Sequence, residues 1–260
     1  MLDIVLRTCD HTEVHPERGL RFINVDKTTL IKKCFISLVN SIQNASTQDI
    51  QLWILDDHSS DSLIDYFEME CDKRNISHRV VRLEETGYNH SALKQFEYCK
   101  DKGRKWVYSV EDDYLHFPEA IDVLIKQAEK FARMVNGPIA LRSDDDMFTY
   151  SENTEYSKKA CRIVLGSERH WRTLHNTHNT FFTHVDVFNN YWELFASLAK
   201  FFRKTTVNED GTINTIWTDS LTKSGPVPLL SPIPTLSIHI SQGNEPVTVD
   251  YKKLWNSIEI

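Results

Sequence analysis

Three consecutive carboxylates, Glu111-Asp112-Asp113, follow the apolar run 107–110. Neighbouring negative charges repel one another, and partial burial makes this repulsion costlier. A divalent cation removes that cost, and one or two carboxylates completed by phosphate oxygens and water form the usual shell of Mg²⁺ or Mn²⁺. Alternation along a strand would place Glu111 and Asp113 on one side and Asp112 on the other. The triplet therefore predicts a metal-assisted phosphate site, with a solvated strand end that begins a helix cap as the alternative.

Two further polar clusters follow apolar runs. The segment 53–61 passes from Trp-Ile-Leu into Asp56-Asp57-His-Ser-Ser-Asp61, and Thr8-Cys9-Asp10 follows the first apolar run of the chain. A carboxylate in the first of these clusters can accept the imide N–H of uracil, while short hydroxyls approach ribose or phosphate. Taken alone, the same cluster is equally typical of a helix-capping turn. Three such clusters at the carboxyl ends of parallel strands would lie where open sheets of this kind bind ligands.

The apolar periodicity indicates how these clusters are positioned. Four strands are expected at 2–8, 51–55, 78–83 and 105–110, separated by helices at 28–45, 61–73 and 90–102. This alternation predicts an α/β fold with a mostly parallel central sheet flanked by helices. A helix from 117 to about 134 and a strand at 139–142 follow, and the alternation then breaks down. The less regular remainder is expected to hold strands at 161–165, 177–183 and 235–240, and helices at 185–203 and 211–224.

Length and composition narrow the class of protein. The 260 residues fit one domain over 1–260, with a nucleotide-binding half at 1–115 and a more variable half at 116–260. A net charge of −7 argues against nucleic acid as a partner, because broad capture of nucleic acid needs a basic surface. Five scattered cysteines, no leading signal sequence and no transmembrane segment lead us to expect a cytoplasmic protein.

The two acidic segments resemble motifs of a family-two type glycosyltransferase with the GT-A fold. Asp56-Asp57-His-Ser-Ser-Asp61 is similar to the Asp-Asp-x-Ser-x-Asp segment of that family, and Gly87-Tyr-Asn-His-Ser-Ala92 is similar to its turn before the next helix. Glu111-Asp112-Asp113 resembles the DxD motif in the acidic form found in several inverting transferases. The resemblance covers residues 2–120 well and the remainder only by position.

The resemblance implies roles for these residues. Asp57 would contact the base of a nucleotide sugar, and Asp113 would bind the metal, with Glu111 and Asp112 supporting it. Thr8 and Asp10 would join Asp57 and Asp112 in holding the donor, for which a UDP-sugar is favoured. Here the sequence departs from the family, which has Pro-Thr-Tyr-Asn where this chain has Arg-Thr-Cys-Asp at 7–10. That departure bears on which nucleotide is bound.

An inverting transferase also needs a general base near the acceptor hydroxyl. The family resemblance implies an xED segment that opens a helix, and Asn208-Glu209-Asp210 matches it, although a polar turn has the same composition. Asp219 is the competing candidate. The resemblance also implies a C-terminal histidine in the metal site, for which His239 stands inside a late apolar run. Imidazole together with carboxylates suits Mn²⁺ better than Mg²⁺, whereas a lone histidine on an apolar strand is otherwise a hydrogen-bonded core residue.

Two more clusters have simpler interpretations. Asp144-Asp145-Asp146 follows a strand, and loop acidity explains it better than a second metal site. The polar, aromatic stretch His170-Trp171-Arg172, with 175–179, is where we expect a sugar acceptor to stack.

The predicted reaction is sugar transfer from a nucleoside-diphosphate donor to a hydroxyl of a glycan or another acceptor, with inversion. Three rival functions stand beside it. A sugar-phosphate nucleotidyltransferase shares the architecture but would need a glycine-rich loop after the first strand, where 7–11 has no glycine. A non-catalytic carbohydrate-binding protein on a decayed transferase fold is the second rival, and a metal-dependent hydrolase is the third.

Overall fold

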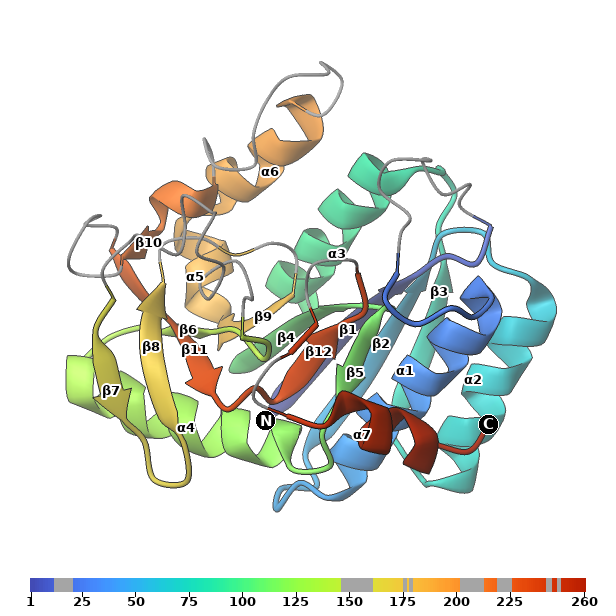
Figure 1. Cartoon of the computed structure of the whole chain (residues 1–260). Coiled ribbons are helices and arrows are strands. Elements are labelled where there is room, and N and C mark those ends of the chain that lie inside the picture. Colours follow the sequence, from blue (N-terminus) through green and yellow to red (C-terminus); the bar gives the residue numbers. More distant parts are fainter. Residues whose placement is uncertain are drawn as a thin grey trace.

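The computed structural model describes residues 1–11, 21–145, 161–174, 177, 180–201, 213–218, 226–241, 245–246 and 249–260. In the front half strands and helices alternate, as the sequence predicts (Figure 1). These elements are β1 (Leu2–Thr8), α1 (Lys27–Gln43), β2 (Ile50–Asp56), α2 (Asp61–Lys73), β3 (His78–Arg82), α3 (Tyr88–Lys102) and β4 (Trp106–Glu111). The back half holds β5 (Tyr114–His116), α4 (Ala120–Val135), β6 (Ala140–Leu141), β7 (Ile163–Leu165), β8 (His170–Leu174), β9 (Phe181–His184), α5 (Val185–Asn190), α6 (Trp192–Phe201), the short 3₁₀ helix η3 (Ile213–Thr215), β10 (Trp217–Thr218), β11 (Val227–Ile233), β12 (Ser237–His239) and α7 (Tyr251–Ser257).

Most strands belong to one sheet with the order β3-β2-β1-β4-β9-β6-β11-β8-β7, and β10 pairs with β11. The front strands β3, β2, β1 and β4 are parallel. Beyond β4 the pairing is mixed, beginning with the antiparallel pair of β4 and β9. The α/β class is therefore confirmed, with the parallel pairing concentrated in the front half. The strand order reverses at β1, because the chain passes from β1 to β2 on one side while β4 lies on the other, and open α/β sheets bind ligands outside the carboxyl ends of the strands at such a point.

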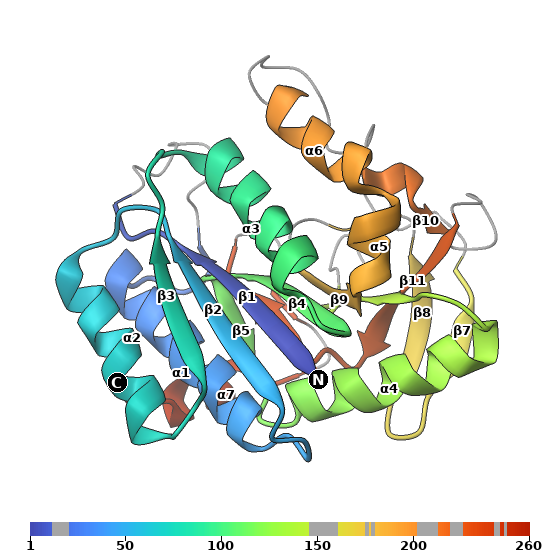
Figure 2. The ribbon, with the colours of Figure 1, turned by 180° about the vertical axis from the view of Figure 1, so that it is seen from behind.

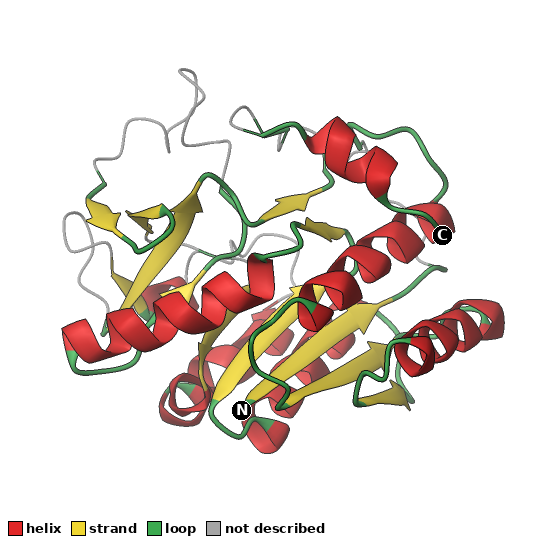
Figure 3. Cartoon of the chain, turned by 90° about the horizontal axis from the view of Figure 1, so that it is seen from below, coloured by secondary structure: helices red, strands yellow, loops and turns green. Residues whose placement is uncertain are grey.

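Helices cover both faces of this sheet (Figures 2 and 3). The alternation of side chains along β1 explains the two layers, since Ile4 and Leu6 pack with the core under α1, α2 and α4, whereas Val5 packs with the core under α3, α5 and α6. All seven residues of β1 are buried, as is expected of a parallel strand covered on both faces. Within the described parts of the chain, no helix combines the length and the apolar character needed to cross a bilayer.

A small second sheet, which the apolar pattern does not predict, joins the middle of the chain to its late segment. β5 and β12 pair antiparallel, with His239 opposite Tyr114 and Ser237 opposite His116. The backbone N–H of Ile240 donates to the carbonyl oxygen of Asp113 at 2.9 Å, which extends this pairing to the acidic triplet. The late strand expected at 235–240 is thus confirmed as β12.

Two helix predictions for the back half are wrong. The single helix expected at 185–203 is broken at Tyr191, between α5 and α6, and the break places the rings of Phe188 and Phe195 4.6 Å apart around Phe181. Both side chains are fully buried. The described part of the range 211–224 forms η3 and β10, because Trp217 is fully buried, packs 5.4 Å from Phe181 and lies on a strand that pairs with β11.

Candidate functional site

The ends of β1, β2 and β4 bring the three predicted polar clusters together at one edge of the sheet. The backbone N–H of Asp57 donates to the carbonyl oxygen of Thr8 at 2.9 Å. The Thr8 hydroxyl donates to Asp112 Oδ2 at 3.0 Å, and the backbone N–H of Cys9 donates to the same oxygen at 2.9 Å. The end of β1 therefore links the segment predicted to bind the base to the acidic triplet.

The three carboxylates of the triplet contact three different partners. Glu111 forms an ion pair with Arg7, Asp112 accepts the hydrogen bonds from the end of β1, and Asp113 Oδ2 lies 3.2 Å from His239 Nε2. β4 ends at Glu111, and the next two residues form a turn. The strand alternation used to predict a common side for Glu111 and Asp113 therefore does not extend to Asp113.

β12 positions His239 beside the triplet. Its ring stacks on the ring of Tyr114, with centroids 4.7 Å apart and planes 3° from parallel. The pairing of β12 with β5 fixes this arrangement, because His239 and Tyr114 are register partners. The structure thus brings His239 to Asp113, the position that the sequence predicted, while its role as a metal ligand stays a prediction.

Burial and neighbouring charges set the protonation of this group. Burial, reinforced by the negative charge of Asp113, raises the pKa of Asp112 to about 6. Burial disfavours the charged form of His239, but the Asp113 carboxylate outweighs it and raises the pKa of His239 to about 9. In the same way burial opposes ionisation of Asp113, but His239 prevails and lowers the pKa of Asp113. Without a bound cation, Asp113 and His239 therefore form an ion pair at neutral pH, and a cation bound at His239 would displace the imidazole proton.

The donor atoms at this position fit a divalent cation. Asp113 Oδ1 is buried and receives no hydrogen bond from the part of the chain that the structure describes. A carboxylate oxygen beside an imidazole nitrogen suits Mn²⁺ better than Mg²⁺. Among the described residues, no three His, Cys, Asp or Glu side chains converge on one metal position. The set therefore fits a cation whose remaining ligands are diphosphate oxygens and water, as is usual for cations bound with nucleotides.

The two aspartates after β2 make different contacts. Asp56 is fully buried, accepts the N–H of Ser59 at 2.9 Å and pairs with Arg82, so it holds the turn in shape. The carboxylate of Asp57 accepts the backbone N–H of Gly87 at 3.1 and 3.3 Å from its two oxygens. Gly87 has a φ of 109°, a conformation that glycine adopts without strain. The loop that begins α3 is therefore fastened to Asp57.

Asp10 fastens the end of β1 to the start of α2. Its carboxylate accepts the backbone N–H of Ser60 at 3.0 Å and the Ser60 hydroxyl at 2.6 Å, and its own N–H donates to Ser59 Oγ at 3.1 Å. These contacts place Asp10 at the predicted edge of the sheet. Its contact with a donor stays a prediction.

Arg7 belongs to the site but was not predicted as a site residue. The residue is 9% exposed. Its guanidinium pairs with Glu111, donates to Ser91 Oγ at 3.2 Å and lies 4.4 Å from the ring centroid of Tyr88. The signal was present in the sequence as a charged residue inside the apolar run 2–8, since a buried charge requires a partner.

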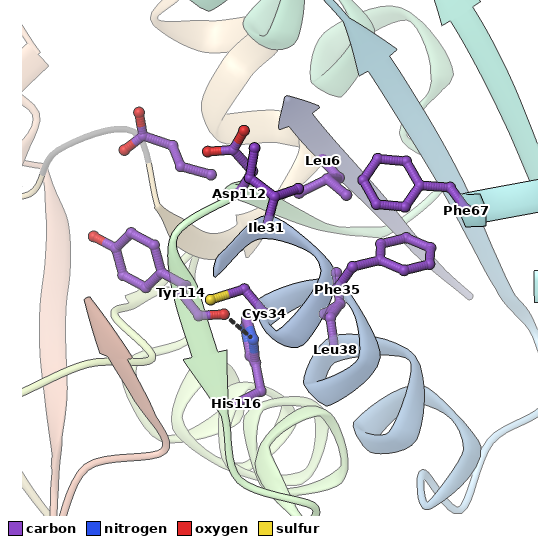
Figure 4. A pocket seen from close by; sticks show the side chains of 10 residues that line it. Leu6, Ile31, Cys34, Phe35, Leu38, Phe67, Asp112, Tyr114 and His116 are labelled. Atoms are coloured by element: carbon purple, nitrogen blue, oxygen red, sulfur yellow. Dashed lines mark hydrogen bonds between the residues drawn. The ribbon is translucent and has the colours of Figure 1, made fainter. Parts of the chain in front are cut away.

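A small cavity lies beneath the triplet (Figure 4). Its volume of about 10 Å³ has room for roughly one water molecule. Its lining is mostly apolar and comes from β1, α1, α2 and the segment from Glu111 through β5. Figure 4 shows Cys34 of α1 close to Tyr114 and His116, and burial raises the pKa of the Cys34 thiol well above its usual range. This cavity is too small for a nucleotide. The outer side of the triplet is therefore the place to expect one.

His116 lines the same cavity, and its burial should make the free energy of unfolding depend on pH. Its Nδ1 lies 3.0 Å from the carbonyl oxygen of Tyr114, and its Nε2 lies 2.8 Å from the Tyr108 hydroxyl. A carbonyl oxygen only accepts, so in neutral His116 Nδ1 carries the hydrogen. Burial lowers the pKa of His116 to about 4, against 6.5 for an unperturbed histidine. Between these values the unfolded chain binds a proton that the folded chain does not, so stability falls as the pH falls.

Lowering the pH from 7 to 5 should reduce the free energy of unfolding by on the order of 2 kcal/mol through His116. Urea unfolding of the parent and of a His116→Gln variant at both pH values measures this, and the variant should show a correspondingly smaller pH dependence. A His170→Gln variant, changed at an exposed histidine, is the control and should follow the parent. An equal pH dependence in the parent and the His116 variant would contradict the assignment.

The stretch at 170–172, where a sugar acceptor was expected to stack, does not expose its aromatic side chain to solvent. Trp171 is fully buried, and Arg172 is 2% exposed and pairs with Asp145 at 2.5 Å. The prediction that a sugar stacks on Trp171 is therefore wrong, because its ring packs against Phe131 of α4, with ring centroids 5.8 Å apart. Both predicted general bases, Asp210 and Asp219, lie outside the described residues, as do positions 175, 176, 178 and 179 of that stretch.

Asp144 belongs to a buried ion pair, which corrects its interpretation as loop acidity. It is 6% exposed, and its Oδ1 accepts from Nε of Arg142 at 3.0 Å while Oδ2 accepts from Nη2. Arg142 is itself 3% exposed. Burial opposes ionisation, but Arg142 prevails and lowers the pKa of Asp144. The two charges are thus buried together.

Comparison with known proteins places the chain in a family. No curated protein sequence matches it. Among solved structures, TarS from S. aureus in complex with UDP is similar at 15% identity and a TM-score of 0.47, covering 77% of this chain and 53% of that one. A mannosyltransferase from Pyrobaculum calidifontis in complex with GDP-Man and Mn²⁺ is similar at 10% identity and a TM-score of 0.45, covering 73% of this chain and 46% of that one. Apo UDP-glucose pyrophosphorylase is similar at 14% identity and a TM-score of 0.48, covering 99% and 98% of the two chains.

This chain spans about half the length of the TarS chain that it matches. The model of the family described as "Glycosyl transferase family 2" matches residues 27–194, which is more than half of the chain. That range contains α1 to α3, the Asp57 segment and the acidic triplet. The family assignment made from these motifs is thereby confirmed. The chain belongs to glycosyl transferase family 2.

Proposed function

We propose that the chain transfers a sugar from a nucleoside-diphosphate sugar, with UDP-sugars favoured, to a hydroxyl group of a glycan or another acceptor. Transfer proceeds with inversion and with the help of Mn²⁺ or Mg²⁺. Family membership supports glycosyl transfer. The observation that carries the metal-assisted form is the contact between Asp113 and His239, beside Asp112, at the carboxyl edge of the parallel strands.

Each residue of the site has a role in this proposal. Asp57 accepts a hydrogen bond from the nucleobase of the donor. Asp112, which accepts a hydrogen bond from Thr8, contacts the donor beside the nucleobase. Asp113 and His239 hold the cation, with Glu111 supporting through its ion pair with Arg7. Asp10 braces the turn that carries Asp57.

The oxygen of the acceptor hydroxyl attacks the anomeric carbon, and the hydroxyl proton passes to Asp210 or Asp219. The bond from that carbon to the diphosphate oxygen breaks, and the diphosphate leaves from the opposite face. Asp113 and His239 would hold the cation, which would supply positive charge beside the departing diphosphate.

The rival functions differ in what they release. A nucleotidyltransferase would form a sugar nucleotide from a sugar phosphate, but the segment 7–11 has no glycine for the phosphate loop that it requires. A hydrolase would release free sugar from the donor without an acceptor, and a carbohydrate-binding protein would do neither. Assays of donor hydrolysis and of transfer, run side by side, separate these cases.

Replacing Asp113 with Asn should abolish the contribution of Mn²⁺ to UDP binding while the fold is retained. The residue lies in a turn, and Asn keeps its size while removing the charge that attracts the cation. Isothermal titration of UDP with and without Mn²⁺ measures the effect, and thermal unfolding with the same ligands gives an independent readout, because a bound ligand stabilises the native state.

An Asp65→Asn variant is the matched control, since Asp65 lies exposed on α2. It should bind UDP and Mn²⁺ as the parent does. Should the Asp113 variant bind UDP and Mn²⁺ as tightly as this control, the proposed metal position is wrong.

A further inference from the structure

Tyr88 is an exposed aromatic side chain fixed beside the proposed base contact. It is the first residue of α3 and follows Gly87, whose N–H binds both oxygens of Asp57. Tyr88 is therefore the next residue along the chain after the one that donates to the Asp57 carboxylate. Among the large hydrophobic side chains that are exposed in the described parts of the chain, Tyr88 is the only aromatic one, at 43% exposure.

Arg7 contacts both the ring and the backbone of this tyrosine. The guanidinium carbon lies 4.4 Å from the ring centroid, within the range of a cation–π contact. Arg7 Nη1 also donates to the Tyr88 carbonyl oxygen at 3.4 Å and to Ser91 Oγ at 3.2 Å. Because Arg7 is buried and anchored by Glu111, it is a rigid support. The ring is thereby held over Arg7, near the carboxyl end of β1.

These contacts combine the two elements that recognise a nucleobase. A carboxylate accepts hydrogen bonds from the edge of a base, and an aromatic ring stacks on its face. Asp57 and Tyr88 supply one of each and are joined through Gly87. We propose that Tyr88 is the stacking wall of the nucleobase subsite and that Arg7 is the positioning residue that orients it. This inference rests on the proposed function and deepens it, because it names the residue that contacts the face of the base.

Replacing Tyr88 with Leu should weaken binding of UDP and of UMP by about 5- to 150-fold, the equivalent of about 1–3 kcal/mol for one stacked base. A Tyr88→Phe variant should bind both within about twofold of the parent, because it keeps the ring and the contact with Arg7. Pyrophosphate with Mn²⁺, which has no base, should bind all three proteins equally. Isothermal titration gives each dissociation constant.

A Tyr98→Leu variant is the matched control. Tyr98 lies on the same helix, ten residues further along, and its ring contacts Trp53 at 5.9 Å. Its loss should leave UMP binding unchanged, which separates stacking on the base from a general loosening of α3. Thermal unfolding of every variant shows whether the fold is retained, as is expected for the exposed Tyr88.

The outcomes of this experiment are distinct. If the parent binds UDP and UMP and the Tyr88→Leu variant binds them equally well, the stacking wall is wrong and the proposed function stands. The stacking wall is also overturned if Phe weakens binding as much as Leu, or if pyrophosphate binding falls in parallel with UMP binding. A parent that binds neither UDP nor UMP removes the UDP-sugar proposal together with this inference.

Discussion

Either Asp210→Asn or Asp219→Asn should lower the rate of sugar transfer by on the order of 10²- to 10⁴-fold, the usual loss when a general base is removed. Asparagine keeps the size of the side chain and its hydrogen bonding but cannot take the acceptor proton. We expect UDP binding to survive, because the proposed base would act on the acceptor hydroxyl and is not among the proposed metal ligands. Transfer rates and UDP dissociation constants, measured for both variants, test this together.

Asp210 is the first choice, because its Asn-Glu-Asp segment matches the family pattern. The helix expected at 211–224 was the reason to regard Asp219 as a residue in mid-helix, and that helix is absent from the part of this range that the structure describes. β10 ends at Thr218, and Asp219 itself lies outside the described residues. Near-parental rates in both variants would contradict the choice of either residue. Loss of UDP binding in both would mean that they support the donor site.

Replacing Arg142 with Met should lower the free energy of unfolding by about 3–5 kcal/mol, the usual result of breaking a buried ion pair by removing one partner. The Asp144 carboxylate would remain buried without the guanidinium that now binds both of its oxygens. Urea unfolding at pH 7 measures the loss.

The double variant Arg142→Met with Asp144→Asn should be more stable than the single variant, since it removes the charge left behind. Arg133→Met, on the exposed side of α4, is the control and should change stability by less than about 0.5 kcal/mol. A loss of less than about 1 kcal/mol in the Arg142 variant would show that water reaches the pair.

The front half of the fold was predictable because its signals are local. The apolar runs of β1, β2 and β4 alternate with helices whose buried faces repeat at helical spacing, and one parallel sheet satisfies all of them. The same pattern placed Thr8, Asp57 and Asp112 at one edge, where the structure has them in contact through β1. Their roles toward a donor stay predictions.

The back half was harder to predict because its strands depend on distant partners. β11 contains Pro228 and Pro232, which argue against a central strand. Within β11, however, only Leu229 and Leu230 pair with β6. Each proline therefore has one strand neighbour, β10 for Pro228 and β8 for Pro232. The missing N–H groups are tolerated for that reason, and neither composition nor periodicity contains this information.

The carboxylates of the site were predictable, but the buried arginine that pairs with one of them was not. Opposite charges attract across strands, so the partner of Glu111 could have been sought among buried cations at a neighbouring strand end. Arg7 is the register partner of Glu111 in the parallel pair of β1 and β4. That register follows from the assembled sheet and from nothing local to either residue.

The pairing of β5 with β12 also sets an order of events during synthesis. Asp113 and His239 are 126 positions apart in the chain, yet their side chains meet because these two strands lie side by side. While the ribosome is still translating the intervening codons, the nascent front half has its Asp57 turn and its triplet but lacks the imidazole. Any chemistry that needs both groups must therefore wait until residue 239 has left the exit tunnel and the late strand has docked.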